Sequence, residues 1–428
     1  MKEIVMIRDK AELARELTEN QYFYAEWRKR SQHERHQRHQ EMLARGRPPE
    51  DLNRANWHGI ATTRGGRRFQ IGLKVLNECE YSGCFNCFLY HEAACTAVTP
   101  ENILAQFDNA LAANRLDVVV GKQGPRWGDP GNADVDQIDF NGSGSFLNHN
   151  ETPREAQLMI FRRLAAMPFR NILIESRIEY AEIDQVRRLR GILRPDQTLT
   201  VAIGLESADD VIRELAIHKG YDLKDFEVCV EALAGVGADV LVYALVRPAF
   251  ITEAEAFEDS LNTGRYLARL AERVRAATGN RDFDLTMKLE PAFIQEGGFL
   301  HFLLQLSEIA AVEGEEPLYE TPWSFTVAGI VETLIAEGVA DLINLQIGRS
   351  TDFPPPIAVT RNRDHEEDLR ANGGRGSSER LDEALQDYNV DHDAGRLAAA
   401  VRDVIRAYPR THAAWLAKVG RSCATVAA

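Results

Sequence analysis

Short apolar segments alternate with longer amphipathic segments between residues 70 and 290, and this alternation limits the folds open to the chain. The apolar segments are predicted strands, at 70–76, 136–141, 171–177, 199–206, 238–247 and 282–290, with a further candidate at 340–347. Helices are predicted between them, at 101–114, 153–166, 180–191, 208–217, 223–236 and 253–276. Strands joined through helices form right-handed crossovers and a parallel sheet. The pattern therefore predicts an α/β fold in which six units form a partial (β/α)6 TIM-type barrel, not a full eight-unit barrel.

Two extensions flank the predicted barrel, which we place at residues 71–345. Residues 1–70 are expected to be a helical N-terminal extension, with one helix over about 10–45. Residues 21–70 carry eleven Lys and Arg against five Asp and Glu, a local charge of +6. This segment is either a solvated helical face or a lid that clamps an anionic substrate, because Arg suits phosphate and carboxylate groups. Residues 346–428 are expected to be a small C-terminal extension with a polar loop at 361–380 and helix over 381–418.

Charge and hydrophobicity argue against several classes of protein. The formal net charge of the 428 residues is −15, which argues against a generally basic nucleic-acid binder but leaves a local basic patch possible. There is no run of about 18 apolar residues, so no membrane-spanning helix is expected. The first residues lack the features of a signal peptide, so a cytoplasmic protein is expected.

Three cysteines directly after the first predicted strand are the strongest local signal. Cys79, Cys84 and Cys87 have the spacing C-x4-C-x2-C. Three thiolates on one tight loop can bind three corners of a cubic iron–sulfur cluster and leave the fourth iron without a protein ligand. The alternatives are a zinc site, with Cys95 or His91 as fourth ligand, and incidental thiols.

The ends of the next strands are polar. The segment 139–148, with the sequence DFNGSGSFLN, follows the second strand, and its glycines would let the backbone approach a small zwitterion. Three later strands carry polar side chains at a spacing of two, which places them on one face. These side chains are Glu175 and Arg177; Asp239, Tyr243 and Arg247; and Asp284, Thr286, Lys288 and Glu290. Such a face either lines a binding cavity or fills the barrel with salt bridges.

A three-cysteine loop after the first strand, followed by a glycine-rich end of the second, resembles the radical SAM enzymes. Within this superfamily the sequence is most similar to the elongator-like branch, and in particular to the radical SAM enzymes of archaeosine synthesis. The segments that carry this resemblance are 141–148, 172–180, 203–226, 245–260 and, more loosely, 319–325.

The resemblance implies a 4Fe-4S cluster on Cys79, Cys84 and Cys87, with S-adenosylmethionine bound to the open iron. An electron from flavodoxin or ferredoxin would cleave S-adenosylmethionine, and the resulting 5′-deoxyadenosyl radical would take a hydrogen atom from the substrate. The residues implied to hold S-adenosylmethionine are Gly142, Ser143, Gly144, Ser145, Glu175, Ser176, Arg177, Glu206 and Ser207. The candidates for substrate contact, or alternatively for internal salt bridges, are Tyr243, Arg247, Lys288 and Glu290.

The sequence departs from the family pattern in three places. The first cysteine gap has four residues in place of three, and Asn86 stands where an aromatic residue is usual. Residues 357–385 lack the cysteines that the archaeosine-type relatives carry in their C-terminal part. The expected substrate is therefore a small anionic metabolite or nucleotide in specialised-metabolite biosynthesis. The alternatives are tRNA modification of the archaeosine type and, from another class, a zinc-binding scaffold protein.

Overall fold

One curved eight-stranded sheet forms the centre of the computed structural model, which describes residues 7–44, 51–63, 66–75, 79–87, 94, 97–121, 124–141, 144–312, 318–348 and 359–420. The sheet contains, in spatial order, β1 (Trp57–Thr63), β2 (Gly66–Gly72), β5 (Val135–Phe140), β6 (Asn171–Glu175), β7 (Thr198–Glu206), β8 (Asp239–Val246), β9 (Leu285–Pro291) and β10 (Asn344–Ile347). From β2 to β10 every neighbouring pair is parallel, and β1 adds an antiparallel edge. The predicted partial barrel is confirmed, and the candidate strand at 340–347 is its seventh parallel strand.

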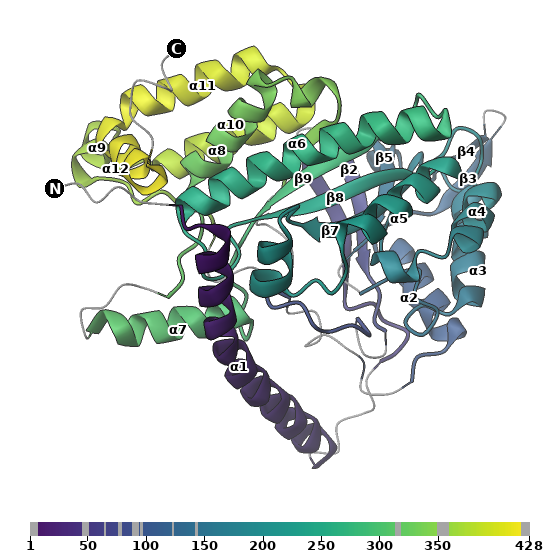
Figure 1. The fold of residues 1–428 in the computed structure, drawn as a ribbon. Helices are drawn as coiled ribbons and strands as arrows, with labels where there is room; N and C mark the ends of the chain where they lie inside the picture. Colours follow the sequence, from purple (N-terminus) through teal and green to yellow (C-terminus); the bar gives the residue numbers. More distant parts are fainter. Residues whose placement is uncertain are drawn as a thin grey trace.

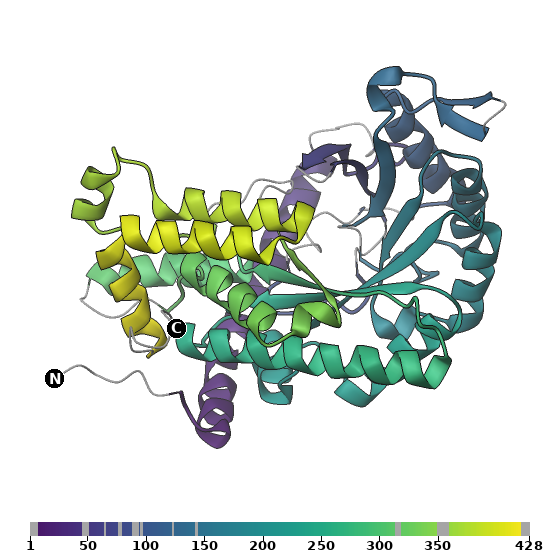
Figure 2. The same cartoon turned by 90° about the horizontal axis from the view of Figure 1, so that it is seen from above.

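Helices connect the parallel strands and cover the outer, convex face of the sheet (Figures 1 and 2). They are α2 (Pro100–Ala113), α3 (Arg154–Ala165), α4 (Ile183–Ile192), α5 (Leu223–Gly235) and α6 (Glu253–Thr278), with short 3-10 turns η2 (Pro130–Asn132), η3 (Ile178–Tyr180) and η5 (Val339–Asp341). The strand side chains that face these helices are apolar and buried. On β9, for example, Leu285, Met287 and Leu289 are fully buried, as the spacing of two predicts. The alternate residues of the same strand, including Lys288 and Glu290, therefore face the lumen.

The first strand is displaced from its predicted place. We predicted it at 70–76, but β2 ends at Gly72. Leu73 and Val75 are buried and apolar, so they look like strand residues in the sequence. The backbone of Lys74 instead hydrogen-bonds to the side chain of Gln106, which accepts its N–H at 2.7 Å and donates to its carbonyl at 3.0 Å. A side chain of α2 thus takes the place of a sheet neighbour.

Other elements differ from the prediction as well. Strand β1 lies in the extension that we expected to be helical, and the hairpin of β3 (Val118–Gly121) and β4 (Gly124–Trp127) was not predicted. The predicted helix at 208–217 is a π-helical turn, η4 (Ile212–Ile217). The predicted loop at 361–380 contains α9 (Glu366–Ala371), where the Asp368 carboxylate accepts hydrogen bonds from Thr411 of a later helix. Such a long-range partner cannot be read from local sequence.

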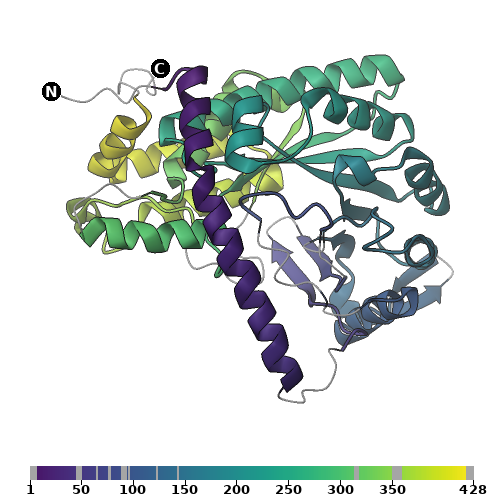
Figure 3. The same ribbon diagram turned by 60° about the horizontal axis from the view of Figure 1, so that its bottom comes forward.

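The extensions pack against the barrel. The predicted N-terminal helix is confirmed as α1 (Lys10–Ala44), which contacts η4 and α7 (Phe299–Val312) and is seen along its length in Figure 3. The C-terminal helices are α8 (Ser324–Ala336), α10 (Ser377–Asp391), α11 (Ala394–Ala407) and α12 (Pro409–Val419). Their buried residues share one apolar core with the barrel. Among the helices that the structure describes, none combines the length and apolar character of a membrane span.

Trp415 tests whether the C-terminal helices are energetically part of the barrel. Its indole packs on Phe257 of α6 and Phe325 of α8 and donates a hydrogen bond to Thr326 at 2.8 Å. We expect Trp415→Ala to lower the free energy of unfolding by about 3–5 kcal/mol, because it leaves a large cavity. Val228→Ala, on the exposed face of α5, should stay within about 0.5 kcal/mol of the wild type. Urea unfolding followed by tryptophan fluorescence and circular dichroism measures both. Separate transitions for the two parts would contradict a shared core.

Candidate functional site

The cysteine loop (residues 79–87) lies beyond the carboxyl end of β2, at the mouth of the barrel. Cys79, Cys84 and Cys87 are all partly buried. The backbone has positive φ angles at Cys79 (91°) and Ser82 (43°), and the Ser82 hydroxyl donates to the Cys79 carbonyl. Such conformations cost energy in residues other than glycine and persist only where neighbouring groups hold them. The loop is therefore a constrained structure.

The glycine-rich segment after β5 touches this loop directly. Gly144 has a φ of 75°, and a Cβ atom there would stand 2.6 Å from the backbone nitrogen of Cys79 and would also collide with Glu151. Only glycine permits this approach. The buried Glu151 carboxylate accepts the N–H groups of Glu80 at 2.7 Å and Ser145 at 2.5 Å, and so joins the two segments. Burial raises the Glu151 pKa, while these donors oppose the rise. The predicted residues Gly142 and Ser143 lie outside the described residues.

Arg177, at the end of β6, brings a positive charge to the cysteines. The guanidinium donates to the Cys84 sulfur at 3.6 Å and lies 3.6 Å from the centre of the Tyr81 ring. Its backbone N–H donates to the Ser145 hydroxyl at 3.1 Å. Burial would lower the Arg177 pKa, but the negative charges of Cys84 and Glu179 outweigh it, and the pKa is raised. A buried cation at this place can pair with an anionic group held by the cysteines. Ser176, which is also buried, bonds through its N–H to the carbonyl of Ala202.

The end of β7 carries Glu206, with a positive φ of 69°. Its carboxylate pairs with the Lys219 ammonium at 2.9 Å, in space that Gly204 leaves open. Burial would lower the Lys219 pKa, but Glu206 and Cys84 hold it above its usual range. The next residue, Ser207, is fully buried, and its hydroxyl donates to Asp259 at 2.6 Å. The two predicted residues therefore have different partners. Glu206 forms an ion pair with Lys219, and Ser207 bonds to helix α6.

Polar groups from three strands meet in the lumen. The Tyr243 hydroxyl donates to Glu175 at 2.6 Å, while Lys288 pairs with Glu290 at 2.6 Å and lies 5.1 Å from the centre of the Tyr243 ring. Burial and the Glu175 charge raise the Tyr243 pKa well above its usual value, so the phenol is neutral at pH 7. Deeper in the lumen, an apolar cluster packs against Tyr243 and consists of Leu173, Ala202 and Leu241. The lumen thus combines a small apolar patch with polar groups.

Arg247 is separated from these polar groups of the lumen. It sits at the end of β8 with a φ of 63°, and its guanidinium donates to Glu253 at 2.7 Å and to the Thr321 carbonyl at 3.1 Å. In a regular strand, Arg247 would lie on the same face as Tyr243. The positive φ turns its side chain away from that face. Its predicted substrate contact stays a prediction.

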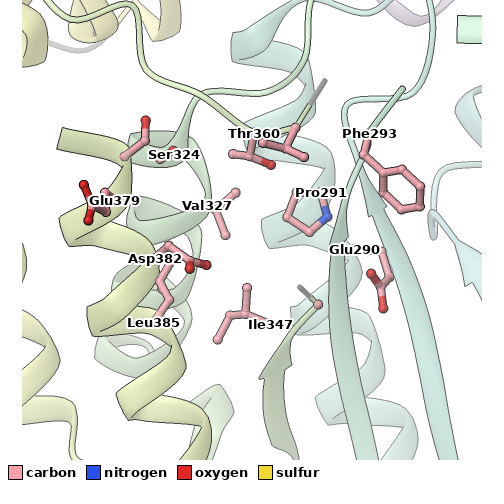
Figure 4. Close-up of a pocket in the computed structure, with 13 residues that line it drawn as sticks. Glu290, Pro291, Phe293, Ser324, Val327, Ile347, Thr360, Glu379, Asp382 and Leu385 are labelled. Carbon is pink, nitrogen blue, oxygen red and sulfur yellow. The ribbon is translucent and has the colours of Figure 1, made fainter. Parts of the chain in front are cut away.

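Two cavities adjoin Glu290. The smaller, of about 60 Å³, reaches Asn86 beside Cys87 and is also lined by Gln295 and Phe299. The larger, of about 230 Å³, lies between the ends of β9 and β10 and the helices α8 and α10 (Figure 4). Both share Glu290, Pro291 and Phe293. Glu290 therefore lies between a cavity that reaches the cysteine loop and a cavity that reaches the C-terminal helices.

The cysteine loop offers three partly buried thiols, the donor type that binds iron–sulfur clusters. Within the described ranges, no group of three His, Cys, Asp or Glu side chains converges on one ion position. In a cubic cluster each cysteine binds a different iron, so the three sulfur atoms need not point at one position. Burial raises the Cys79 pKa, and a bound cation would offset this. The suggested fourth zinc ligands, Cys95 and His91, lie outside the described residues.

The sequence reasoning missed two residues of the site, Glu151 and Lys219. Both act through contacts that are distant in sequence, Glu151 with the cysteine loop and Lys219 with the end of β7. The sequence did contain one local sign of Lys219, the glycine that follows it. In the structure Gly220 has a φ of 78° and leaves room for the Tyr81 hydroxyl. A Lys-Gly pair in the loop that follows a strand ending in a carboxylate was the feature that could have indicated Lys219.

Comparison with known proteins agrees with the motifs. No family model matches the chain. The chain is 40% identical over 119 residues to archaeosine synthase subunit beta of Thermococcus kodakarensis, a match that covers 28% of this chain and 36% of the relative. It is 28% identical over 182 residues to the same subunit of Methanosarcina acetivorans, covering 42% and 48%. Over part of its length the chain is similar to archaeosine synthase subunit beta. The resemblance predicted from the motifs is thus confirmed.

A third relative is an uncharacterized protein of Methanocaldococcus jannaschii, 30% identical over 210 residues that cover 46% of this chain and 53% of the relative. The chain therefore spans about half or less of the length of the curated relatives it matches. Among solved structures it is similar to spore photoproduct lyase, with a TM-score of 0.40 and 12% identity over 62% of this chain and 72% of that one. It is also similar to the radical S-adenosylmethionine methyltransferase TsrM of Kitasatospora setae, with a TM-score of 0.36 and 15% identity over 58% and 40%.

The close approach at Gly144 makes a direct prediction. Gly144→Ala should release the cysteine loop, because the added methyl group collides with Cys79 and the positive φ adds about 1–2 kcal/mol of strain. The matched control is Gly237→Ala, which has a φ of 76° but nothing within 4 Å of the added carbon. Maleimide labelling of Cys79, followed by mass spectrometry, should be faster in Gly144→Ala and unchanged in Gly237→Ala. Equal labelling rates in both variants would show that the approach does not constrain the loop.

Proposed function

We propose that this chain is a radical SAM enzyme that holds a 4Fe-4S cluster on Cys79, Cys84 and Cys87 and binds S-adenosylmethionine beside it. The observation that carries the proposal is the contact of Gly144 with Cys79. Two segments that resemble the same family, more than sixty residues apart, meet at the mouth of a barrel lumen. The sequence likeness to archaeosine synthase subunit beta supports the same assignment.

The residues around the loop suit these roles. Arg177 supplies a buried cation beside Cys84, which favours an anionic cluster and can pair with the carboxylate of S-adenosylmethionine. Glu206 is oriented by Lys219 through one oxygen and offers the other to ribose hydroxyl groups. We assign this contact to Glu206 because the Ser207 hydroxyl is occupied by Asp259. Ser145, next to Gly144, is held by the Glu151 carboxylate and by the backbone N–H of Arg177, and so fixes the position of the glycine-rich segment.

The lumen suits radical chemistry. When bound, the cluster and S-adenosylmethionine together supply a carbon radical that can remove a hydrogen atom from a substrate C–H bond, with flavodoxin or ferredoxin as electron donor. This chain's own residues exclude water and position the substrate, which is where a large part of such a rate enhancement originates. The apolar patch of Leu173 and Leu241 packs against Tyr243 and presents no polar group to a radical. Tyr243, Lys288 and Glu290 offer donors and acceptors.

For the substrate, the named relatives favour modification of tRNA of the archaeosine type over the small anionic metabolite. Glu290, Glu379 and Asp382 line the larger cavity, and its described lining contains no Lys, Arg or His (Figure 4). Carboxylates repel an anionic group, so neither an anionic metabolite nor a phosphate of tRNA is favoured in this cavity, and the preference for tRNA rests on the named relatives alone. A small neutral molecule remains the second candidate, because the cavity is large enough for part of one.

The cluster assignment predicts the effect of removing one thiol. After anaerobic reconstitution, the wild type should contain about four irons per chain and release 5′-deoxyadenosine when given dithionite and S-adenosylmethionine. Cys84→Ala should lose both iron and 5′-deoxyadenosine release. Cys229→Ala, which removes a buried thiol of α5, should keep both. Release of 5′-deoxyadenosine by Cys84→Ala, or zinc without iron in the wild type, would contradict the proposal.

The tRNA assignment predicts a strong salt dependence. Phosphate contacts release counterions, so tRNA affinity should fall steeply with salt, roughly 10³-fold or more between 50 and 200 mM if six phosphates are contacted. Fluorescence anisotropy with labelled tRNA measures this, and a DNA duplex of equal length is the control. If tRNA does not bind at 50 mM salt, the small-molecule alternative replaces it.

A further inference from the structure

Helix α1 is anchored to the barrel at its beginning. The Arg8 guanidinium, just before the helix, donates to the Glu255 carboxylate of α6 at 2.6 and 2.8 Å. Leu13 and Leu17 are buried in an apolar cluster with Ile217 of η4 and its neighbours. These contacts fix the direction in which the helix leaves the body of the protein.

A second anchor lies four turns further along. Trp27 is 4% exposed, and its indole N–H donates to the Gly297 carbonyl at 3.0 Å. It packs with Tyr24 against Phe299 of α7, and the Tyr24 ring lies 3.9 Å from the ring of Phe85, centre to centre. Phe85 belongs to the cysteine loop. One face of α1 is therefore built into the same aromatic cluster as the residue that follows Cys84.

Between these aromatic residues, α1 reaches the backbone of the cysteine loop. The Arg28 guanidinium donates to the carbonyl of Ser82 and, at 2.7 Å, to the Tyr24 hydroxyl. That hydroxyl donates to the carbonyl of Gly83 at 3.4 Å. Both carbonyls lie in the four-residue gap between Cys79 and Cys84, which is one residue longer than the pattern the sequence resembles. Helix α1 thus donates to two of the four carbonyl groups of the lengthened gap, those of Ser82 and Gly83.

The opposite side of the loop is held by the segment after η4. The Phe85 N–H donates to the Ile217 carbonyl at 2.8 Å, and the Tyr81 hydroxyl donates to the His218 carbonyl at 2.8 Å. The positive φ angles at Cys79 and Ser82 are therefore held between two supports. Burial is the main cause of the raised Tyr24 pKa, and the charges of Cys84 and Cys87 add to it, which agrees with the closeness of α1 to both thiols.

We propose that Arg28 and Tyr24 are positioning residues of the cluster site: they fix the Cys79–Cys84 segment and keep one permanent positive charge beside it. The effect of the charge on the cluster rests on the proposed function. The positioning of the loop by Arg28 and Tyr24 does not depend on it. A cation near an iron–sulfur cluster stabilises its more negative, reduced form, since net charge and hydrogen bonding set the reduction potential. The Arg28 guanidinium is thus bonded to the cysteine loop. It differs in this from an arginine of a lid or anion clamp, the role considered for the basic N-terminal segment.

Two readouts test the inference, one of them without a cluster. In the iron-free protein, Arg28→Ala should speed amide hydrogen exchange across residues 79–87 on the order of tenfold, as expected for losing one charge-assisted hydrogen bond. In the reconstituted protein, the same variant should shift the cluster to a more negative reduction potential, measured by EPR-monitored titration. Arg28→Lys should keep most of the potential because it keeps the charge. Lys29→Ala is the matched control, because it removes one charge from the next, exposed position.

The outcomes separate the inference from the function on which it rests. If the wild type takes up no iron, the proposed function fails, and the exchange measurement alone judges the positioning of the loop. If the cluster forms but Arg28→Ala matches Lys29→Ala in both exchange and potential, the inference is wrong. Should Arg28→Ala melt at a much lower temperature than the wild type, Tyr24→Phe replaces it. This variant removes only the hydroxyl and should still speed exchange at residues 82–84; unchanged exchange there would overturn the proposal.

Discussion

The close approach of Gly144 to Cys79 is the constraint on which the site depends. In a parallel sheet all strands end at the same edge, so the loops after neighbouring strands must share the space above the lumen. The cysteine loop follows β2, and the glycine-rich segment follows β5, its neighbour in the sheet. Without a side chain at Gly144, Glu151 can bind the N–H groups of both segments at once. The position of the cysteines relative to the lumen follows from this contact.

Charge is distributed around that contact in a consistent way. Arg177, Lys219 and Arg28 lie on different sides of the cysteine loop, from β6, from the segment after η4 and from α1. Each also has a partner of its own, so the loop is surrounded by cations that are already held in place. Carboxylates lie beside the loop as well, at Glu151 and Glu206, while Glu290 and Asp382 line the larger cavity toward α10. Groups of both charges therefore meet at the cysteine loop, and the larger cavity is lined by carboxylates without a cation among its described lining.

The sequence was sufficient for the parts of the fold and site that rest on local periodicity. The alternating strands and the two faces of β9 follow from hydrophobic spacing, and so does the meeting of Tyr243, Lys288 and Glu290. It failed where the deciding partner is distant. Gln106 ends β2 by bonding to Lys74, Asp259 occupies Ser207, and positive φ angles at Glu206 and Arg247 redirect side chains at the ends of strands. The charge count of the first seventy residues could not indicate that Arg28 bonds to the cysteine loop.

The central claim is that three thiols hold a cluster whose fourth iron is open to S-adenosylmethionine at the mouth of the lumen. Electron–nuclear double resonance on the reduced, reconstituted protein with S-adenosylmethionine labelled with ¹⁵N at its amino group tests this most directly. The account predicts a ¹⁵N coupling from direct binding to one iron, lost when the label is moved to the adenine. A cluster spectrum without any ¹⁵N coupling would contradict it.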